Sequence, residues 1–179
     1  MRVRRVGLLT LLCAALVSCS SGAGKATVLP KISASAPVTA SPDPVPTAAK
    51  AATPEGAAAF ARFWYSEITR AWALRDPRII ARLSAPGCTA CARYTSSIAD
   101  VRARNQRVEG VIFKLTLVEA QAISGKNVKV SVIYDSPATH GYDSSGREVH
   151  SEPAVKNFQE ELALLRSGNS WLVQQDTTV

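Results

Sequence analysis

The chain has 179 residues, of which 46% are hydrophobic, and a formal net charge of +7. Most of this positive excess precedes Thr53, because the segment from Thr53 onward carries 15 basic and 13 acidic residues. A nucleic-acid-binding domain presents a concentrated basic face, so the near balance of charge in the main part of the chain argues against that class.

Residues 1–18 have the pattern of an export signal. Three arginines precede an apolar run over residues 6–17, which matches the basic and apolar regions of a signal peptide. The run is too short to cross a bilayer, which takes about 20 apolar residues. Arg4 and Arg5 leave a twin-arginine export signal open as an alternative.

The stretch that follows, Leu16-Val17-Ser18-Cys19, resembles the bacterial lipobox. The resemblance implies that the thiol of Cys19 carries diacylglycerol and that the signal peptidase for lipoproteins cuts between Ser18 and Cys19. The lipid would then hold the mature chain on the outer face of the cell membrane. An ordinary signal peptide cut after Ser18 or Ala23 is the alternative.

Residues 19–52 are predicted to be a disordered linker. The segment from Ser20 to Ala52 is rich in Ala, Ser, Thr and Pro and has no aromatic residue. Such a composition buries too little apolar surface to offset chain entropy. Fully extended, the linker would reach on the order of 100 Å, so residues 53–179 would form a single domain that stands off the membrane.

The first half of this domain is predicted to be helical. Thr53 and Pro54 have the pattern of an N-cap and first helical residue, and apolar residues then recur at spacings of three and four up to Ala71. Asp76-Pro77 starts a short second helix, and a third helix is expected from Thr89 to about Asn105.

The second half alternates apolar and polar residues with a period of two, which predicts strands. The strands are expected over residues 111–118, 128–134, 155–166 and 171–176. Between them, residues 137–153 form a polar excursion with a turn at Asp143–Gly146 and a small hairpin. Helices followed by an antiparallel sheet define the α+β class, with the helices packed on one face of the sheet.

The segment around residues 53–91 resembles an uncharacterised family of actinobacterial lipoproteins with a nuclear-transport-factor-2-like (SnoaL-like) domain. The features that carry the resemblance are Thr53-Pro54-Glu55-Gly56, the aromatics Phe60, Phe63, Trp64 and Tyr65, and the pair Cys88 and Cys91. The resemblance implies a cone in which three N-terminal helices pack on a curved antiparallel sheet. It implies a location outside the cytoplasm but no activity.

Cys88 and Cys91 form a CxxC motif at the predicted start of the third helix. An exported protein keeps its disulfides, so we expect the two cysteines to pair and to stabilise the turn between two helices. A redox role is the alternative, because a helix N-terminus lowers a thiol pKa. A Cys2His2 metal site with His140 and His150 fits poorly, since nine residues separate the histidines, and no metal or other cofactor is expected.

Candidate catalytic groups are sparse. Asp100, Tyr134 and Asp135 are interpreted as solvated charges and turn residues, and no nucleophile triad or phosphate loop is found. A cone commonly leaves an apolar pocket between helix and sheet. The aromatic residues proposed to line it are Trp64, Tyr94, Phe113 and Trp171. Phe63 and Trp72 are expected to point toward the cone mouth or the solvent.

We therefore expect a membrane-anchored extracytoplasmic lipoprotein that acts as a non-catalytic ligand-binding or protein-interaction module at the cell envelope. Its partners would be the membrane, through the diacylglycerol on Cys19, and an envelope protein or a small apolar ligand. The alternatives are an accessory domain of a larger envelope complex and an enzyme, either a thiol oxidoreductase or a pocket isomerase or hydrolase. An ionisable side chain at the bottom of a closed pocket would favour the enzyme.

Overall fold

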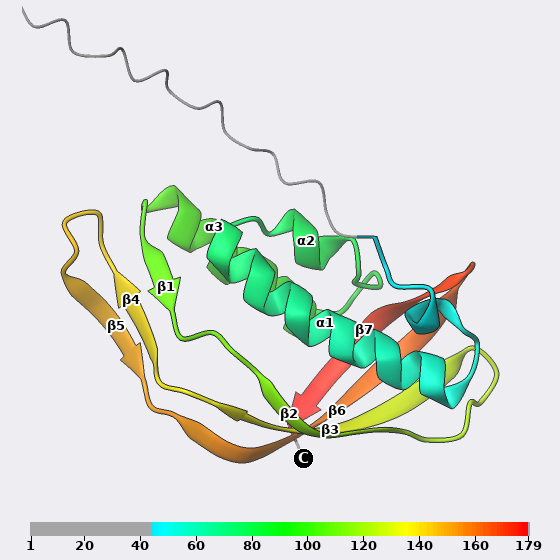
Figure 1. Cartoon of the computed structure of the whole chain (residues 1–179). Helices are drawn as coiled ribbons and strands as arrows, with labels where there is room; N and C mark the ends of the chain where they lie inside the picture. Colours follow the sequence, from blue (N-terminus) through cyan, green and yellow to red (C-terminus); the bar gives the residue numbers. More distant parts are fainter. Residues whose placement is uncertain (1–43, 179) are drawn as a thin grey trace, which may run out of the picture. The chain divides into compact units, whose positions relative to one another are not determined.

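Helices cover one face of a curved antiparallel sheet in the computed structural model, which describes residues 44–178 (Figure 1). The helices α1 (Pro54–Leu74), α2 (Arg78–Ala81) and α3 (Thr89–Ala103) precede all the strands. The predicted α+β class is confirmed. The predicted signal peptide, Cys19 and the linker up to residue 43 lie outside the described residues.

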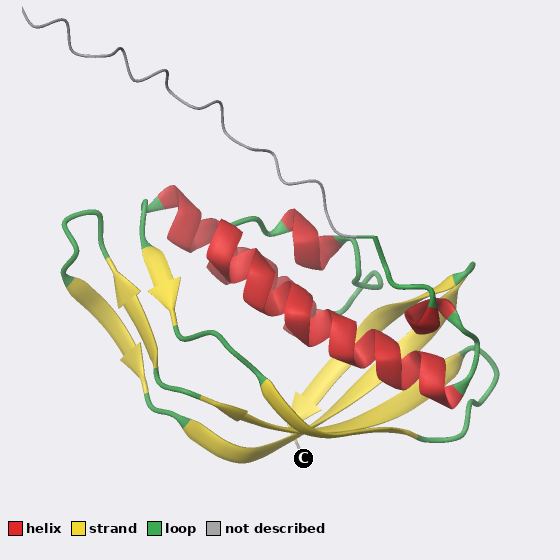
Figure 2. Cartoon of the chain, viewed as in Figure 1, coloured by secondary structure: helices red, strands yellow, loops and turns green. Residues whose placement is uncertain are grey.

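The strands form two sheets, shown in yellow in Figure 2. The larger sheet has the order β2-β3-β6-β7, and the smaller one has the order β1-β4-β5. The larger sheet consists of β2 (Lys114–Ala120), β3 (Asn127–Ser136), β6 (Val155–Ser167) and β7 (Ser170–Thr178). The smaller sheet consists of β1 (Arg107–Glu109), β4 (Thr139–Tyr142) and β5 (Glu148–Glu152). All pairings within the two sheets are antiparallel.

Helix α1 starts and packs as its sequence predicts. The side chain of Thr53 accepts a hydrogen bond from the N–H of Gly56 at 3.1 Å, and Pro54 occupies the first helical position. Phe60, Trp64 and Ile68 are fully buried, because their spacing places them on one face of the helix. This face covers the inner side of β2 and β3.

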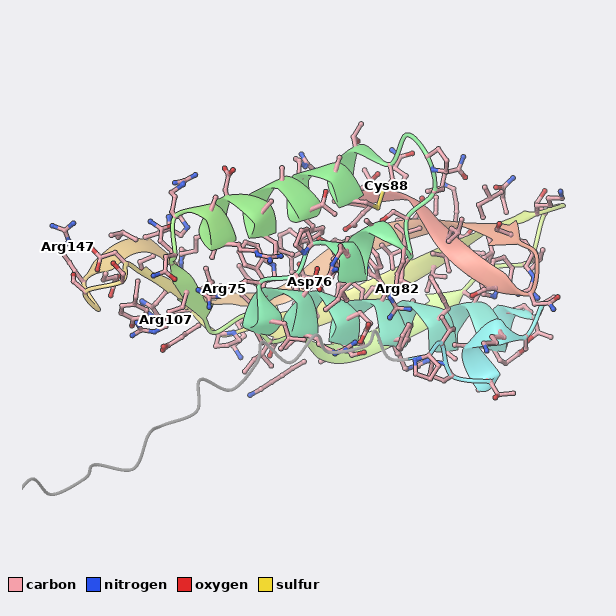
Figure 3. The ribbon with its side chains drawn as sticks, turned by 90° about the horizontal axis from the view of Figure 1, so that it is seen from above. Arg75, Asp76, Arg82, Cys88, Arg107 and Arg147 are labelled. Atoms are coloured by element: carbon pink, nitrogen blue, oxygen red, sulfur yellow. A yellow bond between two sulfur atoms is a disulfide. The ribbon has the colours of Figure 1, made fainter. Side chains whose placement is uncertain are left out.

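A buried ion pair holds α2 against α1. Glu67 of α1 is 2% exposed, and Oε2 of its carboxylate lies 2.5 Å from Nη2 of Arg82, the residue that ends α2. Arg70 contacts the same oxygen at 3.0 Å. Two guanidinium groups therefore compensate the one buried carboxylate, as burial of a charge requires. Arg82 is labelled in the side-chain view of Figure 3.

Residues 137–153 are more ordered than the sequence suggests. The expected turn is present, and Oδ1 of Asp143 accepts hydrogen bonds from the backbone N–H groups of Ser145 and Arg147 at 2.9 and 3.0 Å. The hairpin of β4 and β5 then gains β1 as a third strand. Strand β1 escapes sequence prediction because three residues are too few to show a period of two.

Arginines join the smaller sheet to the end of α1 and connect two of its strands. Arg75 ends α1 in a left-handed conformation, and its Nη1 donates to the carbonyl oxygen of Gln106 at 3.2 Å. The guanidinium of Arg107 on β1 lies 4.5 Å from the ring centroid of Tyr142 on β4. Figure 3 shows Arg75, Arg107 and Arg147 toward one end of the domain, away from Arg82.

The predicted linker boundary at residue 52 is wrong, because residues 44–52 pack on the domain. A short 3-10 helix, η1 (Ala48–Lys50), buries Ala49 at 1% exposure. The indole Nε1 of Trp171 donates to the carbonyl oxygen of Ala51 at 3.0 Å, and Arg166 donates to that of Lys50 at 2.8 Å. Composition does not reveal such a segment, because its contacts are made by backbone carbonyls and by only two apolar side chains, Val45 and Ala49.

We predict that Gly56→Ala destabilises the domain by about 1 to 3 kcal/mol. In the interior of a solvent-exposed helix, the same change would stabilise the protein by about 1 kcal/mol. Here the added Cβ would overlap the carbonyl oxygen of Ala51, and the 44–52 segment would have to move. Urea unfolding of the full chain measures the effect, with the exposed α3 substitution Ser96→Ala as the control expected to change stability by less than about 0.5 kcal/mol. A stabilised Gly56→Ala variant would contradict the close approach.

Candidate functional site

Two cavities open between α3, the end of α1 and the inner faces of the sheets. The first, here called the acidic cavity, has a volume of about 480 Å³. It is lined by Trp72, Ala90, Arg93, Tyr94, Ser97, Glu160, Asp176 and Thr177. The second, here called the aromatic cavity, has a volume of about 900 Å³ and reaches the smaller sheet at Gly141, Val149 and His150. Both cavities are lined by Trp72, Tyr94 and Ser97.

A buried carboxylate lies between two tyrosines at the acidic cavity. Tyr65 of α1 donates its phenolic O–H to Oε2 of Glu160 at 2.6 Å, and Tyr134 of β3 donates to Oε1 at 3.2 Å. Burial raises the pKa of Glu160, whereas the two tyrosine hydrogen bonds oppose this shift. Burial and the nearby Glu160 raise the pKa of both tyrosines, so both remain protonated donors at neutral pH.

A second carboxylate, Asp176 of β7, lies beside the first. Its Oδ1 is buried without a hydrogen-bond partner among residues 44–178. Burial, followed by the charge of Glu160, raises the pKa of Asp176 to about 7, while Arg93 acts in the opposite direction. Asp176 therefore exchanges a proton near neutral pH, which is a property of functional carboxylates.

Aromatic rings surround these groups. The ring centroid of Tyr134 lies 5.5 Å from that of Tyr65, 5.0 Å from that of Phe113 and 5.4 Å from that of Phe158. Tyr134, Phe113 and Phe158 line the aromatic cavity. Aromatic walls beside a few polar groups are typical of a small-molecule site.

Two of the four aromatic residues that were proposed to line a pocket do so, and the other two lie in the hydrophobic core. Tyr94 and Phe113 line the aromatic cavity. Trp64 and Trp171 do not line either cavity, because they are buried in the hydrophobic core at 0% and 1% exposure. Trp72 lines both cavities, which agrees with the prediction that it points toward the mouth of the cone.

Sequence reasoning missed both carboxylates. Glu160 could have been found, because it alternates with Phe158, Leu162 and Leu164 on the apolar face of β6. Asp176 could not. Counting by twos from Trp171 and Val173 places Gln175 on the inner face, but a bulge in the β6–β7 pairing makes Asp176 the partner of Leu162. The bulge reverses the alternation and turns Asp176 inward.

The three residues considered as catalytic candidates lie in different environments. Asp100 is exposed and pairs with Arg104 at 3.0 Å. Asp135 accepts hydrogen bonds from the N–H of Asn157 and from Nζ of Lys156, both at 2.9 Å, and these bonds lower its pKa. Both fit the interpretation as solvated charges. That interpretation is wrong for Tyr134, whose side chain is buried and bound to Glu160.

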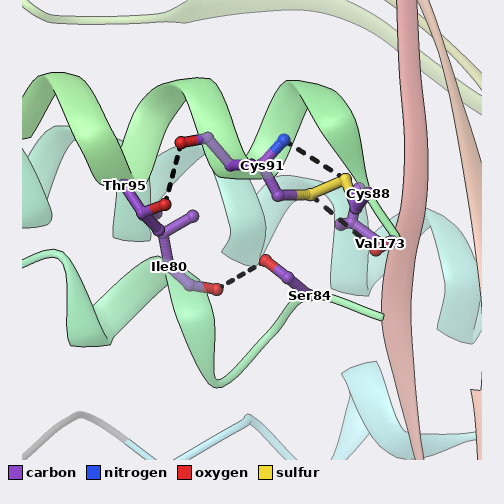
Figure 4. The surroundings of a disulfide bond; sticks show 7 residues. Ile80, Ser84, Cys88, Cys91, Thr95 and Val173 are labelled. Atoms are coloured by element: carbon purple, nitrogen blue, oxygen red, sulfur yellow. Dashed lines mark hydrogen bonds between the residues drawn. A yellow bond between two sulfur atoms is a disulfide. The ribbon is translucent and has the colours of Figure 1, made fainter. Parts of the chain in front are cut away.

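Cys88 and Cys91 form the expected disulfide (Figure 4). Both residues are buried, at 5% and 2% exposure. The Sγ of Cys88 accepts a hydrogen bond from the N–H of Cys91 at 3.2 Å and so caps α3. The Sγ of Cys91 lies 3.8 Å from the carbonyl oxygen of Val173, which also accepts from the N–H of Ala85 at 2.8 Å. These contacts support a structural role, because a reactive cysteine is partly exposed.

The disulfide and the 44–52 segment both fix the first half of β7. The carbonyl oxygen of Ala51 contacts Trp171 at the start of this strand, and the disulfide lies beside Val173 two residues later. Both contacts precede the bulge that turns Asp176 inward. These contacts hold the start of the strand on which the carboxylate lies, as a preorganised site requires.

The alternative Cys2His2 site is not assembled. Both sulfurs are committed to the disulfide, and the two histidines lie on β4 and β5 of the smaller sheet. His150 lies 3.1 Å from the carboxylate of Glu152. Within residues 44–178, no three His, Cys, Asp or Glu residues come together in a metal-binding arrangement.

The described domain is thus an α+β cone with a polar pocket between its helices and its sheets. Residues 33–177 match the sequence model of a family of unknown function (DUF6318), and the chain belongs to this family. No curated protein matches the sequence. None of the helices within residues 44–178 is both long and apolar enough to span a bilayer.

Several solved structures are similar at low identity. The intermembrane space region of the chloroplast protein ARC6 has a TM-score of 0.49 and 10% identity, covering 68% of this chain and 95% of that chain. Aln2 from a Streptomyces species has a TM-score of 0.43 and 10% identity, covering 65% and 85%. A chain named Rd1NTF2_05 has a TM-score of 0.38 and 10% identity, covering 67% and 96%. The order of elements in this chain, three α-helices followed by antiparallel strands, is the one predicted from the sequence.

We predict that Asp176→Asn stabilises the domain at pH 8 by about 2 kcal/mol and changes little at pH 4. The pKa of Asp176 is about 7 in the folded chain and 3.8 as the ordinary value. The wild-type chain therefore loses stability as the pH rises from about 4 to about 7, and the asparagine variant does not. Because Asp176 is only half-buried, solvent screens part of the full effect.

Urea unfolding at several pH values measures this difference. The exposed Asp100→Asn serves as the control, since a surface ion pair contributes about 0 to 1 kcal/mol. A stability difference for Asp176→Asn that is the same at pH 4 and pH 8 would show that the carboxyl group titrates normally.

Proposed function

We propose that this domain is the ligand-binding part of an extracytoplasmic lipoprotein, and that it takes a small molecule into the two cavities. The observation that supports it most is the joint lining of these cavities: aromatic side chains from α1, α3, β3, β6 and the loop before β2, with Glu160 and Asp176 in the lining of the acidic cavity. The volume of about 900 Å³ of the aromatic cavity falls in the range of ligand sites, roughly 300 to 1,000 Å³.

The proposed location rests on the sequence. A basic start, an apolar run over residues 6–17 and the lipobox-like Leu16–Cys19 support export and lipidation of Cys19. The disulfide between Cys88 and Cys91 is consistent with an oxidising compartment. The lipid on Cys19 would make the membrane a permanent partner of the domain.

A second candidate function is acid–base catalysis in the same pocket. The observation that favours it is Asp176, which has a buried oxygen without a partner and a pKa of about 7. A carboxyl group with these properties transfers protons efficiently at neutral pH. The protonated phenols of Tyr65 and Tyr134 lie next to it around Glu160. A binding domain needs none of these proton transfers, so turnover of a bound compound would favour the enzyme.

We predict that the uncharged fluorescent probe N-phenyl-1-naphthylamine binds to the full chain and that Val149→Asp weakens its binding at least tenfold. Val149 is 43% exposed and lines the aromatic cavity, so a charge there opposes entry of an apolar ring. Ile112→Asp is the matched control, because Ile112 is a similar exposed side chain, at 50%, that does not line this cavity. Fluorescence titration measures both, and equal effects of the two substitutions would refute the pocket.

We predict that Cys19→Ala removes the chain from the membrane fraction of the native host. Intact-mass analysis of the membrane-extracted wild type should show a chain that starts at residue 19 and carries lipid. Ser21→Ala, outside the lipobox, is the control and should leave the mass of the lipid and the membrane association unchanged. An unlipidated wild-type chain that keeps residues 1–18 would overturn the proposed location.

A further inference from the structure

We infer that the acidic cavity selects a small organic cation, whose charged group lies beside Glu160 and Asp176 and whose apolar body lies against Trp72 and Tyr94. The inference deepens the proposed function and rests on it. The ligand class is a primary or secondary ammonium ion with an aromatic or aliphatic body.

The charges of the cavity support a cation. Glu160 and Asp176 lie on adjacent strands and face the same side of the sheet, because Asp176 pairs with Leu162 and Glu160 is two residues before it. Neither carboxylate forms an ion pair with a lysine or arginine of residues 44–178. The buried Glu160 and the half-buried Asp176 repel each other when both are ionised, and a bound cation would remove this repulsion.

The hydrogen bonds leave a place for a donor. Glu160 has its two phenolic donors, one on each oxygen. Asp176 differs, because its buried Oδ1 accepts from no described group. A buried acceptor without a donor is unfavourable by about 1 to 3 kcal/mol, and an ammonium N–H can supply the missing donor.

The aromatic side chains fit the same ligand. Trp72 and Tyr94 line both cavities and so flank the path from the aromatic cavity to the carboxylates. Aromatic ring faces attract ammonium groups and also pack against the apolar part of an amine. The volume of about 480 Å³ of the acidic cavity limits the ligand to a small molecule.

Other charged and titratable groups around Asp176 affect its pKa. Glu160 on β6 raises the pKa of Asp176 and Arg93 on α3 lowers it. The phenols of Tyr94 on α3, Tyr65 on α1 and Tyr134 on β3 also face it, and all three have a raised pKa. Arg93 is exposed at the cavity wall, so solvent and salt screen its repulsion of a bound cation.

This geometry couples binding to a proton. A cation next to Asp176 favours its ionised form, so the carboxyl group releases its proton when the ligand binds. The affinity for a cation should therefore rise with pH through the pKa of Asp176, about 7, while the affinity for a neutral compound of the same shape should not.

Calorimetric titration of the full chain with three matched probes tests the inference. The probes are 2-phenylethylammonium, 2-phenylethanol and phenylacetate, at pH 6 and pH 8. The amine stays protonated over this range, as a lysine does. We expect the ammonium ion to bind at least tenfold more tightly than the alcohol at pH 8, phenylacetate to bind most weakly, and only the ammonium affinity to rise between pH 6 and pH 8, by about fivefold.

Asp176→Asn should lower the ammonium affinity at least tenfold at pH 8, remove its pH dependence and leave the alcohol affinity within twofold. The control Glu119→Gln removes an exposed negative charge on β2, outside both cavities, and should change nothing. Because the titrations of the wild-type chain already test the preference and its pH dependence, the inference does not depend on the folding of any variant.

The outcomes separate the two proposals. An ammonium ion that binds no better than the alcohol, or does not bind, overturns the cation preference. Binding of N-phenyl-1-naphthylamine then decides whether the pocket itself survives, since that probe carries no charge. If neither N-phenyl-1-naphthylamine nor any of the three probes binds, both the proposed function and the inference are refuted.

Discussion

The packing of α1 against the inner face of β2 and β3 is the contact on which the rest of the domain depends. Phe60, Trp64 and Ile68 bury one face of the helix, and Val130, Val132 and Leu162 supply fully buried side chains from the sheet. Burial of each large apolar side chain contributes roughly 1.5 to 3 kcal/mol. The same packing brings Tyr65 to Glu160, whose positions are 95 residues apart in the chain.

The carboxylates of Glu160 and Asp176 lie at the edge of this core, where apolar packing gives way to the cavities. A core position would ordinarily hold an apolar residue, because a buried charge is unfavourable unless it is hydrogen-bonded. Glu160 meets that condition through two phenols, whereas Asp176 does not meet it fully. Polar groups whose burial is unfavourable for folding are common at functional sites, because binding and catalysis require them.

The amino-acid sequence determined what depends on neighbours along the chain. The cap at Thr53, the apolar stripe of α1, the alternation of β3 and β6 and the turn at Asp143–Gly146 are local signals, and they predicted the α+β class. The pairing of Cys88 with Cys91 was predicted from the export signal, because an exported protein keeps its disulfides.

Only the tertiary structure decided which side chains face the pocket. Trp64 and Tyr94 have the same aromatic character in the sequence, but one lies in the core and the other lines the cavities. Residues 44–52 and β1 are ordered by contacts to distant strands, which composition does not report. Asp176 faces inward because of a bulge between two paired strands. Pairing register depends on both strands together, and no single segment of sequence contains it.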